Sequence, residues 1–177
     1  TLNPYDDESG VNKTQYRVNT GEWKDYTNPV TISIEGKNTL EYRSEDNFGN
    51  VEDTQSIDIS IDKTAPVLKL NVDKPILSKP NHKLEHITVT LDSLDDISRI
   101  DSIILESIKV NEANVTPDDI IGANYGTKCT EFNLRSERNG YGNGRIYTIT
   151  YLAKDKAGNI VRSTATVTVP KGSQVNN

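Results

Sequence analysis

The chain contains the stretch Tyr42-Arg43-Ser44-Glu45-Asp46-Asn47-Phe48-Gly49-Asn50-Val51, which returns as Tyr151-Leu152-Ala153-Lys154-Asp155-Lys156-Ala157-Gly158-Asn159-Ile160. Tyr, Asp, Gly and Asn occupy the same relative positions in both copies. Each copy precedes an alternating apolar stretch and then a proline, Pro66 after the first and Pro170 after the second. Internal repetition of this kind indicates two related units in tandem. The repeated phrase is therefore interpreted as part of the fold and not as a catalytic site.

The repeated phrase carries the chemistry of a tight turn. An Asp at the start of a type I turn accepts a hydrogen bond from a backbone N–H two residues further on. A Gly three residues after it adopts the left-handed conformation that closes a hairpin with a bulge. We therefore predict two structural turns, with Tyr42 and Tyr151 facing the core. The predicted turn residues are Asp46, Gly49, Asn50, Asp155, Gly158 and Asn159.

The repeat also predicts the domain organisation of the 177 residues. We expect a short unit over residues 1–63, a longer unit over residues 64–170, and a tail or linker over residues 171–177. Pro66 fixes its own φ and disfavours helix at Ala65, so the boundary between the units is predicted to be extended and fairly stiff.

Short runs of alternating apolar and polar residues recur throughout the chain, with Gly, Asn and Pro between them. Val30–Ile34, Ile57–Ile61 and Ile87–Leu91 are three such runs, and no long stretch has helical periodicity, although residues 93–102 allow a short helical turn. This spacing predicts an all-β chain of two tandem immunoglobulin-like β-sandwich domains.

Charge and composition exclude some classes of function. The 20 basic and 26 acidic residues give a formal net charge of −6, which argues against nucleic acid and anionic membrane as partners. No apolar run approaches the roughly 20 residues of a membrane helix. The chain begins at Thr1, which we interpret as the start of a piece of a longer protein. The lone Cys129 is predicted to be a small buried apolar residue, with a reactive thiol as the alternative.

Acidic clusters are the best candidates for a metal site, because calcium prefers hard oxygen ligands. Their spacing matches no known calcium loop, so solvated loop charge remains the alternative, and we predict no other cofactor. His82 and His86 lack a supporting zinc motif. The candidate calcium ligands are Asp6, Asp7, Asp95, Asp96, Asp118 and Asp119.

Two further features have both a structural and a functional interpretation. The glycine-rich stretch Gly140–Gly144 precedes a predicted strand, so we interpret it as a hairpin turn rather than a phosphate-binding loop, which leads into a helix. Trp23, the sole tryptophan, follows a turn. It either packs against the sandwich or is exposed on a ligand-binding surface.

Residues 1–66 resemble the bacterial Ig-like repeats first named from a spirochaete outer-membrane protein. The second unit looks like another bacterial Ig-like module, found in secreted multidomain proteins. The matching residues of the first unit include Ser9-Gly10-Val11, Tyr16-Arg17-Val18, Trp23, Leu40-Glu41-Tyr42-Arg43-Ser44 and Asp62-Lys63-Thr64-Ala65-Pro66. Those of the second include Lys79-Pro80-Asn81-His82, Phe132-Asn133-Leu134-Arg135 and Asp155-Lys156-Ala157-Gly158-Asn159.

The resemblance implies non-catalytic accessory or spacer modules of a secreted or cell-wall-attached bacterial protein. Their partners would be neighbouring domains of the same polypeptide, and the parent protein would carry the catalytic or binding activity. A module that binds carbohydrate or a host surface ligand is the alternative. Family members also have one or two strands before the Ser-Gly-Val phrase, so the first unit is expected to lack its opening strand and to expose an unpaired sheet edge.

Overall fold

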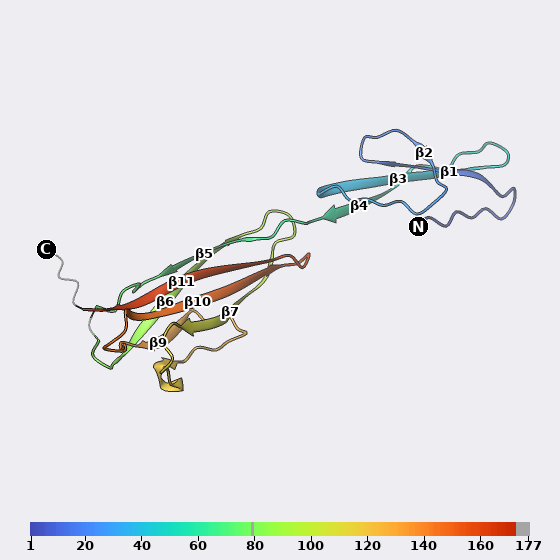
Figure 1. Cartoon of the computed structure of the whole chain (residues 1–177). Helices are drawn as coiled ribbons and strands as arrows, with labels where there is room; N and C mark the ends of the chain where they lie inside the picture. Colours follow the sequence, from blue (N-terminus) through green and yellow to red (C-terminus); the bar gives the residue numbers. More distant parts are fainter. Residues whose placement is uncertain (79, 173–177) are drawn as a thin grey trace. The chain divides into compact units, whose positions relative to one another are not determined.

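The structure is a computed structural model that describes residues 1–78 and 80–172. The chain divides into two compact units, Thr1–Lys63 and Thr64–Asn177. Its strands pair antiparallel into sheets, which confirms the predicted all-β, immunoglobulin-like class (Figure 1). Most of the predicted tail, residues 173–177, lies outside the described residues, as does Lys79 of the resemblance. No helix among the described residues is long and apolar enough to cross a membrane.

The first unit is built on one four-stranded sheet with the strand order β2-β1-β3-β4. Tyr16 pairs with Tyr42 across β1 and β3, and Leu40 pairs with Ile57 across β3 and β4. Because side chains alternate between the faces of a strand, these four residues lie on the same, apolar face. The four strands are β1 (Val11–Val18), β2 (Lys24–Asp25), β3 (Gly36–Asp46) and β4 (Gln55–Ile61).

Loops rather than a second sheet cover this apolar face. The buried amide of Asn38 donates hydrogen bonds to the carbonyls of Ile34 and Gly36, which holds the segment before β3 against one end of the face. Tyr26 packs edge-on against Tyr16, with 6.3 Å between ring centroids, and its hydroxyl accepts a hydrogen bond from the backbone of Leu2. The residues before β1 are thereby tied to the sheet.

The predicted strand at Val30–Ile34 is not formed, although its residues alternate as a strand requires. This segment has no regular strand pairing among the described residues, and only side chains such as Asn38 and Lys63 hold its carbonyls. A strand needs a neighbouring backbone as well as an alternating pattern.

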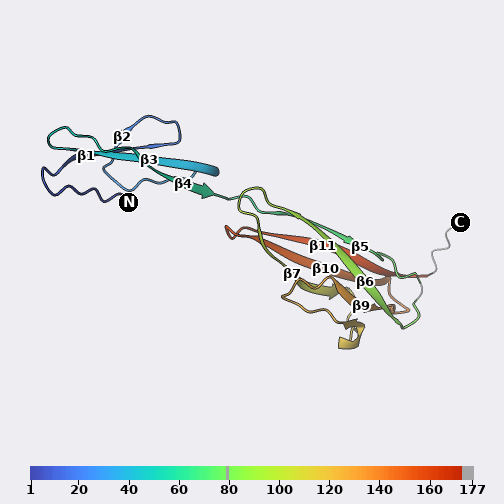
Figure 2. The same cartoon turned by 180° about the vertical axis from the view of Figure 1, so that it is seen from behind.

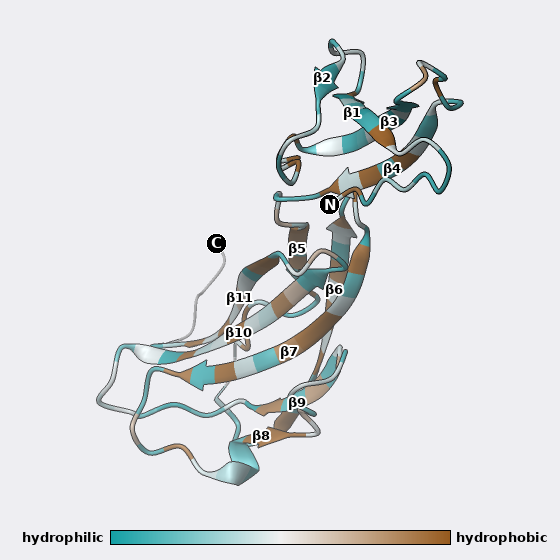
Figure 3. Cartoon of the chain, turned by 90° about the vertical axis from the view of Figure 1, so that its right-hand side faces the viewer, coloured by the Kyte–Doolittle hydropathy of each residue, from teal (hydrophilic) through white to brown (hydrophobic). Residues whose placement is uncertain are grey.

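The second unit is a sandwich of two sheets, with the strand orders β11-β10-β7 and β5-β6-β9-β8 (Figure 2). Sixteen buried apolar side chains form its core, fifteen from the facing sides of the two sheets and Leu77 from the segment after β5. Figure 3 shows apolar and polar segments alternating along β7, as expected for a strand with one face on this core. The strands are β5 (Val67–Val72), β6 (Leu84–Leu94), β7 (Ile100–Val110), β8 (Ile120–Ile121), β9 (Glu131–Arg135), β10 (Gly144–Asp155) and β11 (Ile160–Pro170).

One loop prediction for the second unit needs correction. The helical turn allowed within residues 93–102 is not formed, because β6 continues to Leu94 and β7 begins at Ile100. The bend between them is held by the Asp95 side chain, which accepts backbone hydrogen bonds from Ser98 and Arg99. The irregular region after β7 contains the short 3-10 helix η1 (Pro117–Asp119) and β8.

Residues 75–77, which follow β5, lie beside β11 and run in the same direction as that strand. Ile76 forms a parallel bridge with Thr168 of β11. The Leu77 N–H donates to the Thr168 carbonyl at 2.8 Å, and the Thr168 N–H donates to the Pro75 carbonyl at 2.9 Å. Both hydrogen-bonding groups of Thr168 therefore point away from β10, and they close the sandwich at this edge.

Gly144, at the start of β10, provides a test of the packing. Its φ is +103°, and an added Cβ would lie 2.7 Å from the Val169 carbonyl. Gly158 has a φ of +99° with open space around it. We expect Gly144→Ala to destabilise the second unit by about 2 kcal/mol more than Gly158→Ala, because both substitutions add backbone strain and only the first also adds a clash. Calorimetric melting of the two variants measures this difference, and equal melting temperatures would contradict it.

Candidate functional site

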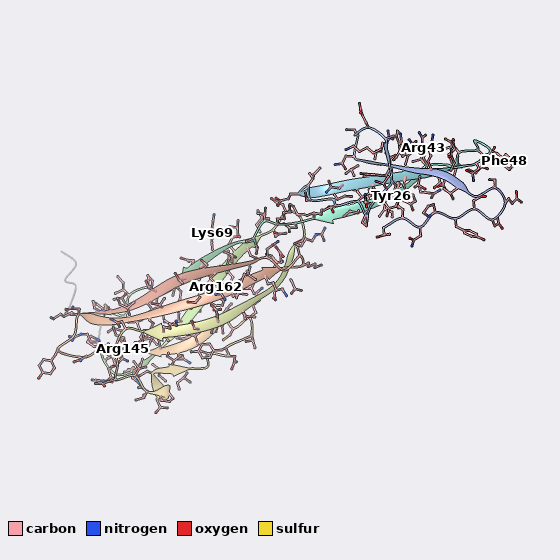
Figure 4. All side chains as sticks on the ribbon, turned by 45° about the vertical axis from the view of Figure 1, so that its right-hand side comes forward. Tyr26, Arg43, Phe48, Lys69, Arg145 and Arg162 are labelled. Carbon is pink, nitrogen blue, oxygen red and sulfur yellow. The ribbon has the colours of Figure 1, made fainter. Side chains whose placement is uncertain are left out.

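The first copy of the repeated phrase forms the hairpin between β3 and β4. One oxygen of the Asp46 carboxylate accepts backbone hydrogen bonds from Phe48 and Asn50, both at 2.8 Å, and the other accepts the Asn50 amide at 2.7 Å. Gly49 has a φ of +87°. Figure 4 shows Phe48 at the tip of this hairpin. The phrase therefore closes a turn through its own side chains.

The second copy repeats this geometry between β10 and β11. The Asp155 carboxylate accepts the backbone N–H of Asn159 at 2.8 Å and its side-chain amide at 2.9 Å, and Gly158 is left-handed. In both copies the Gly N–H donates to the Asp carbonyl at 3.2 Å. The two hairpins are thus built by the same set of contacts.

The tyrosines of the two copies have different surroundings. Tyr151 is fully buried, its hydroxyl donates to the Cys129 carbonyl at 2.5 Å, and burial raises the pKa of the phenol. Tyr42 lies on the apolar face of the first sheet but is only half-buried. The difference follows from the second layer of strands, which covers Tyr151 and does not cover Tyr42.

Of the six candidate calcium ligands, Asp6 and Asp7 precede β1 in the first unit, and Asp96 and Asp118 lie in separate surface segments of the second unit. Asp6 closes a turn by accepting backbone hydrogen bonds from Ser9 and Gly10, and these bonds lower the pKa of its carboxyl group. Asp7, Asp96 and Asp118 are exposed. Calcium binding at these positions stays a prediction.

The other two candidates, Asp95 and Asp119, have defined neighbours. One carboxylate oxygen of Asp95 lies within 4.8 Å of one of Asp155. Asp119 is buried, and its two oxygens lie 2.9 Å from Arg135 Nε and 3.3 Å from Arg145 Nη1. Both oxygens of Asp119 are thus occupied by arginines.

Asp119 belongs to a buried ion-pair network that the sequence did not reveal. Arg145, at the start of β10, is 2% exposed and forms a 2.8 Å ion pair with Glu112 in addition to its contact with Asp119. Arg145 also lies 3.2 Å from the Tyr147 hydroxyl, which donates to the Arg135 carbonyl. The carboxylates come from the long loop that follows β7, so the network fastens this loop to the sandwich.

The glycine-rich stretch is a turn that leads directly into β10. The Gly142 N–H donates to the Asn139 carbonyl, and the Asn139 N–H donates to the Glu112 carboxylate. A carboxylate therefore already accepts the N–H at the start of this turn, and a strand rather than a helix follows it. Cys129 is half-buried against the core and near the Gly122 carbonyl, while His82 is an exposed neighbour of Glu137.

Trp23 is half-buried and stacks with two arginines of the first sheet. The guanidinium carbons of Arg17 and Arg43 lie 4.9 and 4.3 Å from the ring centroid. Arg17 also forms an ion pair with Glu41. These cation–π contacts occupy ring surface that a sugar would otherwise stack on.

A hollow of about 690 Å³ opens over the opposite, apolar face of the first sheet. The residues before β1 form one wall, with the exposed Tyr5 among them, and Tyr42, Val51 and Ile57 contribute apolar surface. The Glu52 carboxylate at its rim accepts the backbone N–H of Ser44 at 2.6 Å. The described residues therefore leave apolar side chains at this hollow beside acidic ones, without a constellation of nucleophile and base.

The family model of the bacterial Ig-like domain (group 3) matches residues 22–133, which is more than half of the chain. Among solved structures, the chain is similar to fibronectin(III)-like modules of Clostridium thermocellum CbhA, at 13% sequence identity. That comparison covers 98% of this chain and 85% of the other, with a TM-score of 0.37. No curated protein matches the chain.

The ion-pair network yields a prediction for stability. Replacing Arg145 by Met would leave the Glu112 carboxylate without its arginine and Asp119 with Arg135 alone, at a largely buried site, and we expect a loss of about 3–5 kcal/mol. The control is Arg162→Met, because Arg162 pairs with Glu106 on the surface and its side chain is 52% exposed (Figure 4). That substitution is expected to cost about 0–1 kcal/mol. Urea unfolding followed by circular dichroism measures both, and similar losses would contradict the structural role.

The carboxylates of the first unit predict its response to acid. The pKa of Asp46 is lowered by the Asn50 amide, that of Glu41 by Arg17, and that of Asp58 by Lys37, from ordinary values of 3.8 for Asp and 4.5 for Glu. A carboxyl group whose pKa is lower in the folded state stabilises the fold above its unfolded pKa, and this contribution disappears as the pH falls through the folded pKa. We therefore expect the urea midpoint of the first unit to fall from about pH 5 downwards.

Trp23 fluorescence reports this transition, because the sole tryptophan lies in the first unit. Asp46→Asn removes one of the titrating carboxylates and should make the midpoint less sensitive to pH. A urea midpoint that stays constant or rises on acidification is incompatible with this account.

Proposed function

Because the chain belongs to the family of bacterial Ig-like domains of group 3, we propose that it is a non-catalytic accessory module of a secreted or cell-surface bacterial protein. Its role would be to hold a catalytic or binding domain of the same polypeptide at a distance. Domains of this family are common in extracellular proteins. The matching hairpins at Asp46 and Asp155 support two related modules in tandem within this spacer.

The path of the chain through the second unit is the observation that carries the proposal. The chain enters this unit at the start of β5 and leaves it after β11, at the opposite end of the sandwich (Figure 1). A module with ends so placed adds its own length to a string of domains. A module with adjacent ends would instead form a side branch.

The parallel contact between residues 75–77 and β11 suits such a role under load. Tension would pull residues 75–77 towards the point where the chain enters the unit and β11 towards the point where it leaves. The two parallel segments would therefore slide past each other. The hydrogen bonds of Thr168 to Pro75 and Leu77 lie across the direction of this sliding, so both would have to break together before the segments could move. The core behind them is closed by Leu77, which is buried.

A carbohydrate- or host-ligand-binding module is the second candidate function. Trp23, the predicted binding residue, gives it little support, since Arg17 and Arg43 stack with its ring. The exposed Tyr5 at the hollow of the first unit is a better aromatic candidate. We favour the spacer role because it uses the whole architecture of the second unit.

The load-bearing role predicts a specific mechanical phenotype. Thr168→Pro removes the N–H that donates to Pro75 and leaves the pairing with β10 in place, because that N–H points away from β10. When the protein is pulled from both ends in a force microscope, we expect the unfolding force of the second unit to fall by roughly a third or more, as one of the two sliding-resistant hydrogen bonds is lost.

The matched control is Thr166→Pro in the same strand. Thr166 is two residues from Thr168, so its N–H points the same way, and it has no hydrogen-bond partner on that side among the described residues. This variant is expected to keep the wild-type unfolding force. Equal losses in both variants would show that the contact does not bear load.

A further inference from the structure

The first unit leaves its apolar sheet face poorly covered. Leu40 is the only buried apolar side chain among the described residues of this unit, whereas the second unit buries sixteen. Ile57 on β4 faces the same side as Leu40 and is 48% exposed. Loops shield this face at the Ile34 end, and the hollow lies over it where Tyr42 and Ile57 meet. Apolar surface is thus available next to β4.

The outer edge of β4 is also available for backbone pairing. β4 is the last strand of its sheet and pairs only with β3 among the described residues, without a register shift. In an antiparallel ladder, alternate residues direct their N–H and C=O groups to the outer side. Its seven residues include no proline, and Asp58 is the only charged one. Proteins usually protect an edge of this kind with a bulge, a proline or several charges.

Two edge strands of the second unit are hydrogen-bonded in part to segments outside the sheets, and its edge strand β5 includes the charged Lys69. Leu105 of β7 exchanges hydrogen bonds with Gly126 and Thr127, and Thr168 of β11 does so with Pro75 and Leu77. The edge strand β8 has two residues, and so does β2 at the other side of the first sheet. Among the described strands, β4 therefore combines a long open edge with an adjoining apolar face.

The net charges of the two units indicate which kind of partner the first unit would attract. Residues 1–63 contain 13 acidic and 6 basic side chains, a formal charge of −7, whereas residues 64–177 contain 13 and 14, a charge of +1. The hollow is bordered by Glu45, Asp46 and Glu52. A second copy of the chain would bring two such acidic units together, which costs electrostatic energy. A basic partner is instead attracted.

We propose that β4 accepts an added β-strand from another protein, namely an extended segment in which lysine or arginine alternates with apolar residues. Its backbone would pair with the outer edge of β4. Its apolar side chains would cover Ile57 and enter the hollow, and its basic side chains would lie on the opposite face, where they would compete with Lys37 for Asp58. The first unit would then be a docking site in addition to a spacer.

The test uses the full chain and a capped nine-residue peptide of alternating lysine and valine, followed by fluorescence anisotropy of the labelled peptide. We expect saturable binding that weakens at least tenfold when lysine is replaced by glutamate. An equal loss is expected when alternate backbone amides are N-methylated, because the peptide then cannot form the ladder. Hydrogen exchange should slow at β4 amides when the lysine peptide binds. Equal binding of the N-methylated peptide would overturn strand addition and leave only non-specific charge attraction.

Two matched variants locate the site. Ile57→Lys places a charge on the apolar face beside the edge and should weaken peptide binding at least tenfold. Ile121→Lys changes an isoleucine of similar exposure, 39%, on the edge strand β8 of the second unit, and it should leave binding unchanged. Equal effects of both variants would overturn the proposal. So would a protein that fails to bind the peptide and sediments as a dimer that Ile57→Lys dissociates, because the occupant would then be a second copy.

Discussion

Every sheet in this chain has one apolar face, and what covers that face determines the rest of the structure. In the second unit each sheet covers the other, so Tyr147, Tyr151 and Ile149 reach full burial. In the first unit the cover consists of loops held by Asn38 and Tyr26. The same alternating sequence pattern therefore gives a closed core in one unit and a partly open face in the other.

The second unit also contains a charged side chain in its interior, where a β-sandwich is normally apolar. Arg145 is buried at the start of β10, and its cost of desolvation is offset because Glu112, Asp119 and Tyr147 surround it. The carboxylates come from the long loop that follows β7. These ion pairs fasten the loop to the sandwich, although it has little regular structure of its own.

Features set by near neighbours in the sequence were predictable, and those set by distant ones were not. Asp46 and Gly49 are three residues apart, so their turn follows from the phrase itself, and the alternation around Ile87 gives its strand directly. Val30–Ile34 alternates equally well but pairs with no strand, and the side chains of Asn38 and Lys63 hold two of its carbonyls instead. Arg145 and Glu112 are 33 residues apart, and nothing in the sequence around either one signals their contact.

The uneven charge of the two units connects the spacer role with the open edge. An acidic unit of −7 beside a nearly neutral one resists self-association, which is the main hazard of a long unpaired strand such as β4. The same charge admits a basic strand, since attraction then adds to backbone pairing and to the burial of Ile57. Acidic side chains therefore give the edge selectivity without blocking it, whereas a lysine or proline within β4 would have protected it against every partner. A module whose sole role is to separate domains would not require an edge that admits basic strands and excludes others.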